Sequence, residues 1–185
     1  MKNLIFQALA ESACNGETVA LGIITGVKGS SPQKVGAKAL FYADGRIKGT
    51  LGGGCLEAEI HRRALQSLRT GQASVFDLLL DHDFGWDDGL ICGGKVFGVI
   101  LPNAQQAGEN FWAELATSDA PRTWGVKTDF SITPADSTVQ HPNDSIAPGW
   151  LYTETVTPPC ALWVAGSGHI AQVVAPLALQ LDFAV

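Results

Sequence analysis

The 185-residue sequence has no apolar run that approaches the roughly 18–20 residues needed to span a membrane. Its N-terminal apolar stretch is short, is broken by Gln7 and runs into Glu11 without a small-residue cleavage site, so it predicts a helix rather than a secretion signal. Charged residues make up only 16% of the chain, while hydrophobic residues make up 46%, which excludes a disordered tail. We expect one domain, or one domain and part of another.

The cysteines also lack a familiar spacing. None of the four forms the C-x-x-C pair of zinc ribbons and thioredoxin-like redox sites; they are Cys14, Cys55, Cys92 and Cys160. Without a signal peptide, we expect reduced thiols and a cytoplasmic protein. There is no G-x-S-x-G elbow, and His61 is nearly two helical turns from Cys55, which makes a poor catalytic pair. Serine or cysteine hydrolase chemistry therefore finds little support.

The charge balance argues against a nucleic-acid partner, because the net charge is −6. Residues 28–69 nevertheless hold eight basic residues against three acidic ones, a local charge of +5, so the remainder carries −11. A basic, glycine-rich segment in an acidic protein indicates a small anionic ligand. A solvated charged face explains the same pattern, and on charge alone it is the simpler interpretation.

Hydrophobic periodicity predicts an α/β protein. We expect an N-terminal mixed sheet flanked by helices, followed by the first βα unit of an incomplete Rossmann domain. The predicted helices cover 3–14, 55–70, 105–117 and 166–180, and the predicted strands cover 18–27, 37–42, 46–50, 74–80, 95–101, 121–127 and 160–165. Three regions follow: an N-terminal domain over 1–130, a proline-rich connector with a possible edge strand over 131–159, and the start of the Rossmann domain over 160–185.

The first candidate site is Gly52-Gly53-Gly54-Cys55, directly before an amphipathic helix. Three glycines allow a sharp turn and a close approach of the backbone to a ligand. A helix N-terminus then favours an anion or a thiolate at Cys55. The alternative is a tight turn from a hairpin to a helix with an inert cysteine, and the residues alone do not decide between the two.

A second pairing of cysteine with glycine is Cys92-Gly93-Gly94, at the end of a loop and before a strand. If both loops meet at one edge of the sheet, Cys55 and Cys92 could face one pocket; a simple turn is the alternative. The same loop holds carboxylates and a histidine, but it lacks the alternating oxygens of a calcium loop, so we favour a solvated loop there. Those residues are Asp81, His82, Asp83, Asp87 and Asp88.

A third site lies at Gly166-x-Gly168-His169, between a predicted strand and a predicted helix. That context is typical of the dinucleotide-binding turn of a Rossmann domain. The sequence ends before any acidic residue that could hold a ribose, and Pro176 predicts a kink in the helix. His169 could face a ligand, although solvent commonly satisfies a histidine at this position.

Three blocks, taken together, resemble the XdhC/CoxF family, accessory proteins of xanthine dehydrogenase and related molybdenum hydroxylases. They are GSSPQKVGAKALFYADGRIKGTLGGGCLEAEI (29–60), GLICGGKVFGVI (89–100) and WVAGSGHIAQVVAPLALQLDF (163–183). The resemblance implies an N-terminal α/β domain and a C-terminal Rossmann domain, which looks truncated here. It also implies a protein that binds molybdenum cofactor, protects it during sulfuration and delivers it to the apo-hydroxylase.

The resemblance assigns the cofactor site to seven residues: Gly52, Gly53, Gly54, Cys55, Cys92, Gly93 and Gly94. Cys55 and Cys92 would be the residues that touch the molybdenum. In the full-length protein Gly166, Gly168 and His169 would bind NAD(P). The implied partners are a molybdenum hydroxylase such as xanthine dehydrogenase, a cysteine desulfurase and a second copy of the chain.

A cofactor chaperone, rather than an enzyme, is the function that the resemblance favours. The first alternative is a nucleotide-dependent oxidoreductase or sulfurtransferase that uses the Rossmann turn and a reactive cysteine. The second is a regulatory or scaffolding domain that docks a hydroxylase without binding a ligand.

Overall fold

The computed structural model describes residues 2–79, 94–136, 147–181 and 183–185. The first of its sheets has five strands in the order β3-β2-β1-β5-β4. Every neighbouring pair in it is antiparallel. The bounds are β1 Val19–Lys28, β2 Lys38–Tyr42, β3 Ile47–Gly49, β4 Ser74–Leu79 and β5 Lys95–Leu101.

The α/β class is therefore confirmed, but the sheet is antiparallel rather than mixed. The reason is where helix α2 (Gly54–Thr70) takes the chain. It leads from β3 to β4, which run in the same direction but lie at opposite edges of the sheet with β2, β1 and β5 between them. A crossover of this kind creates no parallel pair, because its two strands are never neighbours.

A second sheet has three strands in the order β7-β6-β8, again all antiparallel. Its strands are β6 Arg122–Lys127, β7 Ile132–Pro134 and β8 Trp150–Val156. The edge strand that the sequence indicates within 131–159 is β8, and β7 is a strand that periodicity did not indicate. The boundaries of the three regions stay predictions.

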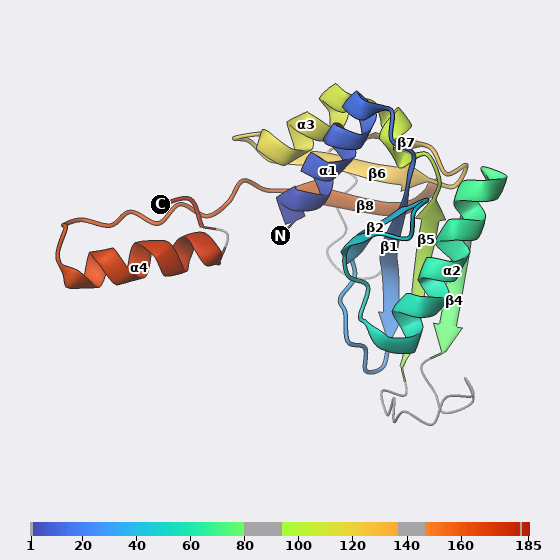
Figure 1. Ribbon diagram of the computed structural model, residues 1–185, viewed down its shortest axis with the longest axis horizontal. Coiled ribbons are helices and arrows are strands. Elements are labelled where there is room, and N and C mark those ends of the chain that lie inside the picture. Colours follow the sequence, from blue (N-terminus) through green and yellow to red (C-terminus); the bar gives the residue numbers. More distant parts are fainter. Residues whose placement is uncertain (1, 80–93, 137–146, 182) are drawn as a thin grey trace.

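Two cores cover the two faces of the first sheet, because side chains alternate along β1. Val19, Leu21 and Ile23 belong to the core shared with α1 (Lys2–Asn15), the second sheet and α3 (Glu109–Thr117). Ala20 and Ile24 belong to the other core, under α2. Figure 1 shows α2 along one side of the strands, with α1, α3, β6 and β8 gathered at one end of them.

The helix predicted over 105–117 is divided in two. A 3-10 turn, Ala104–Ala107, comes first, and α3 begins only at Glu109. Gly108 separates them with φ +107°, a conformation that a helix cannot continue through and that glycine adopts readily.

The C-terminal segment holds α4, His169–Gln180, with Pro176 inside it. The strand expected over 160–165 amounts, in the described residues, to one parallel bridge between Ala161 and Ala184. In Figure 1 α4 lies to one side of the two sheets, on the far side of the molecule from α2. That this segment begins a Rossmann domain remains a prediction. Within the described ranges, no helix has the length and apolar character to cross a bilayer.

Candidate functional site

Two of the predicted motifs meet the same short segment, residues 29–33, at one end of the first sheet. A Cβ atom on Gly52 would lie 2.9 Å from Cγ of Pro32, and one on Gly94 would lie 1.8 Å from the carbonyl oxygen of Ser30. The backbone therefore approaches the 29–33 segment closely at both glycines. Cys92 and Gly93 lie outside the described residues, so Gly94 alone places the second motif. The carboxylates and the histidine of the same loop also lie outside them: Asp81, His82, Asp83, Asp87 and Asp88.

The glycine–cysteine turn, Gly52–Cys55, has the sharp backbone that its composition predicts. Its three glycines have φ angles of +129°, +72° and +57°, in the region that side chains disfavour. Nothing lies within 4 Å of where a side chain on Gly53 would be. The turn thus exposes backbone on one side while it packs on Pro32 on the other.

Cys55 is the second residue of α2, half-buried, with a free thiol. The residue that caps the helix, Gly53, provides no side-chain hydrogen bond to it. The first intrahelical bond runs from the N–H of Glu57 to the carbonyl of Gly53, at 3.3 Å. The N–H groups of Gly54, Cys55 and Leu56 precede this bond and have no partner within the helix.

Thr50 and Glu57 are functional candidates that the sequence analysis missed. The Glu57 carboxylate accepts hydrogen bonds from the Thr50 hydroxyl (2.7 Å) and the Leu51 N–H (2.8 Å). A carboxylate in the first turn of a helix that follows a glycine run is the signal that could have identified it.

The basic segment 28–69 does not form one positive surface, contrary to the simplest form of the anion hypothesis. Lys38 is buried and its Nζ lies 2.6 Å from Glu154. Arg46, on the β2–β3 hairpin, pairs with Asp44 and with Glu17, which precedes β1. Arg62 and Arg63 both pair with Glu59, whose pKa falls to about 2, chiefly through the Arg62 hydrogen bond. Their charge is therefore largely compensated by nearby carboxylates.

Two lysines lie at the site end of the sheet, and one of them is paired with a carboxylate. Lys28 and Lys95 are opposite each other across β1 and β5, directly beside the 29–33 segment and Gly94. Their Nζ atoms lie 5.7 Å and 5.3 Å from the ring centre of Phe97. Lys95 also contacts Asp77 at 2.7 Å. Lys95 and Phe97 are further residues that the sequence alone did not single out, because only the fold brings β5 beside β1.

The predicted dinucleotide turn lies apart from this end of the sheet. Gly166 has φ +118°, Gly168 caps α4, and His169 is the first, exposed residue of that helix. Both glycines face open space, with nothing within 4 Å of a side chain placed there. The structure thus does not bring Gly166, Gly168 and His169 to the glycine–cysteine turn, and their binding of NAD(P) stays a prediction.

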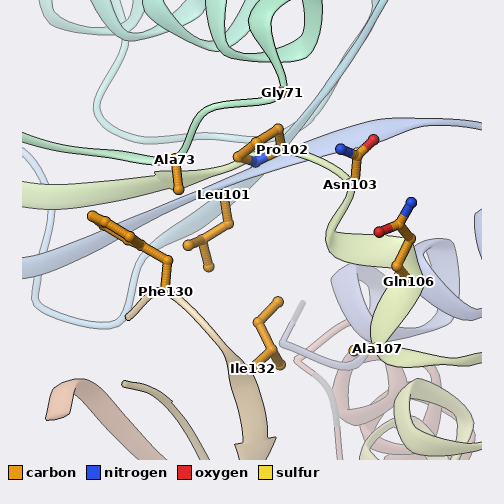
Figure 2. A pocket seen from close by; sticks show the side chains of 9 residues that line it. All are labelled: Gly71, Ala73, Leu101, Pro102, Asn103, Gln106, Ala107, Phe130 and Ile132. Atoms are coloured by element: carbon orange, nitrogen blue, oxygen red, sulfur yellow. The ribbon is translucent and has the colours of Figure 1, made fainter. Parts of the chain in front are cut away.

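A cavity of about 360 Å³ lies at the opposite end of the first sheet, where α2 and β5 end. Figure 2 shows the amides of Asn103 and Gln106 on one side of it and Leu101, Phe130 and Ile132 on the other. Its lining includes no charged residue, cysteine or histidine: Gly71, Ala73, Leu101, Pro102, Asn103, Gln106, Ala107, Phe130 and Ile132. It offers neither a counter-charge nor a soft ligand, so it is not the candidate site.

In the parts of the chain that the structure describes, no three histidine, cysteine or acidic side chains gather as a metal site. The three described cysteines are unpaired: Cys14, Cys55 and Cys160. The chemical possibilities of the glycine–cysteine turn are therefore those of one thiol beside free backbone N–H groups.

The chain is similar to proteins of one family. The sequence model of the XdhC and CoxI family matches residues 13–80. A probable xanthine dehydrogenase subunit of Bacillus subtilis (strain 168) is 36% identical over 82 residues, which are 43% of this chain and 25% of that protein. The chain thus matches about a quarter of the length of this relative.

A crystal structure of a xanthine dehydrogenase from Bacillus halodurans superposes with a TM-score of 0.72 at 21% identity, over 96% of this chain and 60% of the other. At that identity the likeness shows the fold. The range matched by the family model contains the 29–33 segment, the glycine–cysteine turn and all of α2. Residues 13–80 are therefore similar to the XdhC and CoxI family, in agreement with the first of the three blocks that carry the resemblance.

Proposed function

We propose that the chain acts as an accessory protein of a xanthine dehydrogenase-type molybdenum hydroxylase. In this proposal it binds molybdenum cofactor at the glycine–cysteine turn, protects it while sulfur from a cysteine desulfurase is installed, and delivers it to the hydroxylase. The relationship to the Bacillus subtilis and Bacillus halodurans proteins supports the choice of partner.

The observation that carries the proposal is the turn itself: three left-handed glycines lead directly to a half-buried free thiol at a helix N-terminus. The donor groups fit the cofactor, which is a phosphate ester that also bears sulfur and a metal. The N–H groups at the start of α2 would hold the phosphate. The Cys55 thiolate is a soft ligand that would hold the molybdenum or its sulfur.

Lys28 and Lys95 support the same assignment through charge. Both lie at the end of the sheet where Gly52 and Gly94 meet the 29–33 segment. The charge of Lys95 is partly compensated by Asp77, so Lys28 contributes most to the attraction of a small anion. The assignment of Cys92, Gly93 and Gly94 to the same site rests on the sequence and on the contact of Gly94 with Ser30.

The test is the molybdenum and pterin content of the full-length protein purified from cells that synthesise the cofactor. We expect both in the wild type, and a clear loss in Cys55→Ala. Cys14→Ala is the matched control, because Cys14 is a free, exposed thiol at the end of α1. Wild-type content in Cys55→Ala would contradict the assignment of the thiol.

Delivery needs a separate experiment with an apo-hydroxylase. The loaded protein should restore xanthine dehydrogenase activity, and the cofactor should leave it as activity appears. Turnover of NAD(P)H by the protein itself, with no bound pterin, would instead favour a nucleotide-dependent oxidoreductase. A persulfide trapped on Cys55, without pterin, would favour a sulfurtransferase.

A further inference from the structure

Glu57 folds back from the first turn of α2 onto the chain that precedes the glycine–cysteine turn. One atom, Oε2, accepts two hydrogen bonds: from the N–H of Leu51 at 2.8 Å and from Oγ1 of Thr50 at 2.7 Å. Oγ1 of Thr50 in turn accepts the N–H of Gly52 at 3.2 Å. A single carboxylate oxygen thus fixes the residue before the turn directly and the first glycine through Thr50.

The charge state of Glu57 agrees with this arrangement. Burial alone would raise the pKa of the carboxyl group. Hydrogen bonds from Thr50, Leu51 and Gly53, together with the charge of His61, outweigh burial and hold the pKa below its ordinary value. The side chain is therefore ionised at neutral pH and can only accept hydrogen bonds.

A turn of three glycines needs such an anchor. Glycine loses more conformational freedom on folding than any other residue, and Gly53 has no neighbour for a side chain to pack on. The packing of Gly52 on Pro32 holds one side of the turn. The Glu57 carboxylate holds the residues before the turn, Thr50 and Leu51, from within the helix that follows it.

We infer that Glu57, with Thr50, is a positioning residue that orders the glycine–cysteine turn for the anionic cofactor. The inference rests on the proposed function for the identity of the ligand. Glu57 acts on the backbone of residues 50–53, so it leaves the N–H groups of Gly54, Cys55 and Leu56 for the ligand. Its negative charge next to the start of α2 is also favourable for the helix dipole.

The test compares four variants. Glu57→Ala removes the acceptor, while Glu57→Gln keeps a carbonyl oxygen that can accept from both Leu51 and Thr50. Thr50→Val removes the link to Gly52 but leaves the bond from Leu51 to Glu57. Glu59→Gln is the matched control, because Glu59 lies on the same helix and pairs with Arg62 and Arg63 rather than with the turn.

The first readout is amide hydrogen exchange, which needs no ligand. Glu57→Ala should speed exchange at Leu51 and Gly52 roughly tenfold or more, since a bond to a charged acceptor is lost. Thr50→Val should speed it at Gly52 alone. Glu57→Gln and Glu59→Gln should stay within about threefold of wild type. Unchanged exchange at Leu51 and Gly52 in Glu57→Ala would overturn the inference.

The second readout is the affinity for isolated molybdenum cofactor. Glu57→Ala should weaken it about tenfold, and Glu57→Gln should restore most of it. If the wild type binds and Glu57→Ala binds equally well, the positioning role is wrong. If the wild type does not bind at all, the proposed function fails, and the exchange readout still decides whether Glu57 orders the turn.

Discussion

The ammonium group of Lys38 lies 2.6 Å from the carboxylate of Glu154, and the two side chains are only 5% and 9% exposed. Lys38 is on β2 and Glu154 is on β8, so this ion pair joins the two sheets. Nζ of Lys38 also donates to the carbonyl of Gly36 at 2.9 Å and to the hydroxyl of Tyr152 at 3.2 Å. Through the bond to Gly36, Lys38 also fixes the backbone just after the 29–33 segment.

Removing one partner of this pair should be costly. Lys38→Met removes the ammonium group that faces the buried Glu154 carboxylate, so we expect a loss of about 3–5 kcal/mol in the free energy of unfolding. Urea denaturation measures it.

The double variant Lys38→Met/Glu154→Gln should be more stable than Lys38→Met alone, because the buried carboxylate is replaced by a neutral amide. That amide can still accept from the Trp124 indole, which lies 3.3 Å from Glu154 in the wild type. If the free energy of unfolding of Lys38→Met lies within about 1 kcal/mol of wild type, the ion pair does not contribute to stability as we expect.

Gly94→Ala should disturb the contact between β5 and the 29–33 segment. The added methyl group would lie 1.8 Å from the Ser30 carbonyl oxygen and 3.0 Å from that of Lys28, so the backbone must move. We expect a destabilisation of about 1–3 kcal/mol, measured by urea denaturation, together with weaker cofactor binding.

Gly168→Ala is the control for Gly94→Ala. Gly168 has φ −71° and open space around it. The free energy of unfolding of Gly168→Ala should therefore stay within about 0.5 kcal/mol of the wild-type value. Equal effects of the two substitutions would contradict the close approach at Gly94.

The decrease in stability at acidic pH should depend in part on Glu59. Hydrogen bonds and charge from Arg62 and Arg63 lower its pKa from 4.5 to about 2, against an opposing effect of burial. A carboxyl group whose pKa is lower in the folded than in the unfolded protein stabilises the fold at pH values above its unfolded pKa. This stabilisation is lost as the pH falls from 4.5 towards 2.

Glu59→Gln should therefore be less stable than wild type at neutral pH, by at most about 1 kcal/mol because Arg62 is largely exposed. The difference should vanish near pH 2. Urea denaturation at several pH values measures it, and a difference that is constant with pH would refute the ion-pair explanation.

Local signals predicted much of the fold. The strand predicted over 95–101 has the bounds that its composition indicates. Features that depend on contacts between distant parts of the sequence could not be predicted from local signals. β7 has three residues, ends in Pro134, and exists because it pairs with β6. Strand order depends on where α2 carries the chain, which no periodicity encodes.

The site shows the same division. Three consecutive glycines before an amphipathic helix predict the glycine–cysteine turn, and the backbone angles agree. Lys38 looked like part of a basic segment because its partner Glu154 is distant in the sequence. Gly52 contacts Pro32, and Gly94 contacts Ser30, only in the folded chain. The sequence therefore could not show that both motifs pack on the same segment, 29–33.

The most direct test of the central claim is a titration of the purified protein with isolated molybdenum cofactor, followed by pterin fluorescence. The account predicts saturable binding by the wild type and by Cys14→Ala, and binding by Cys55→Ala that is weaker by about tenfold or more. Equal affinity in Cys55→Ala, or no saturable binding by the wild type, would contradict it.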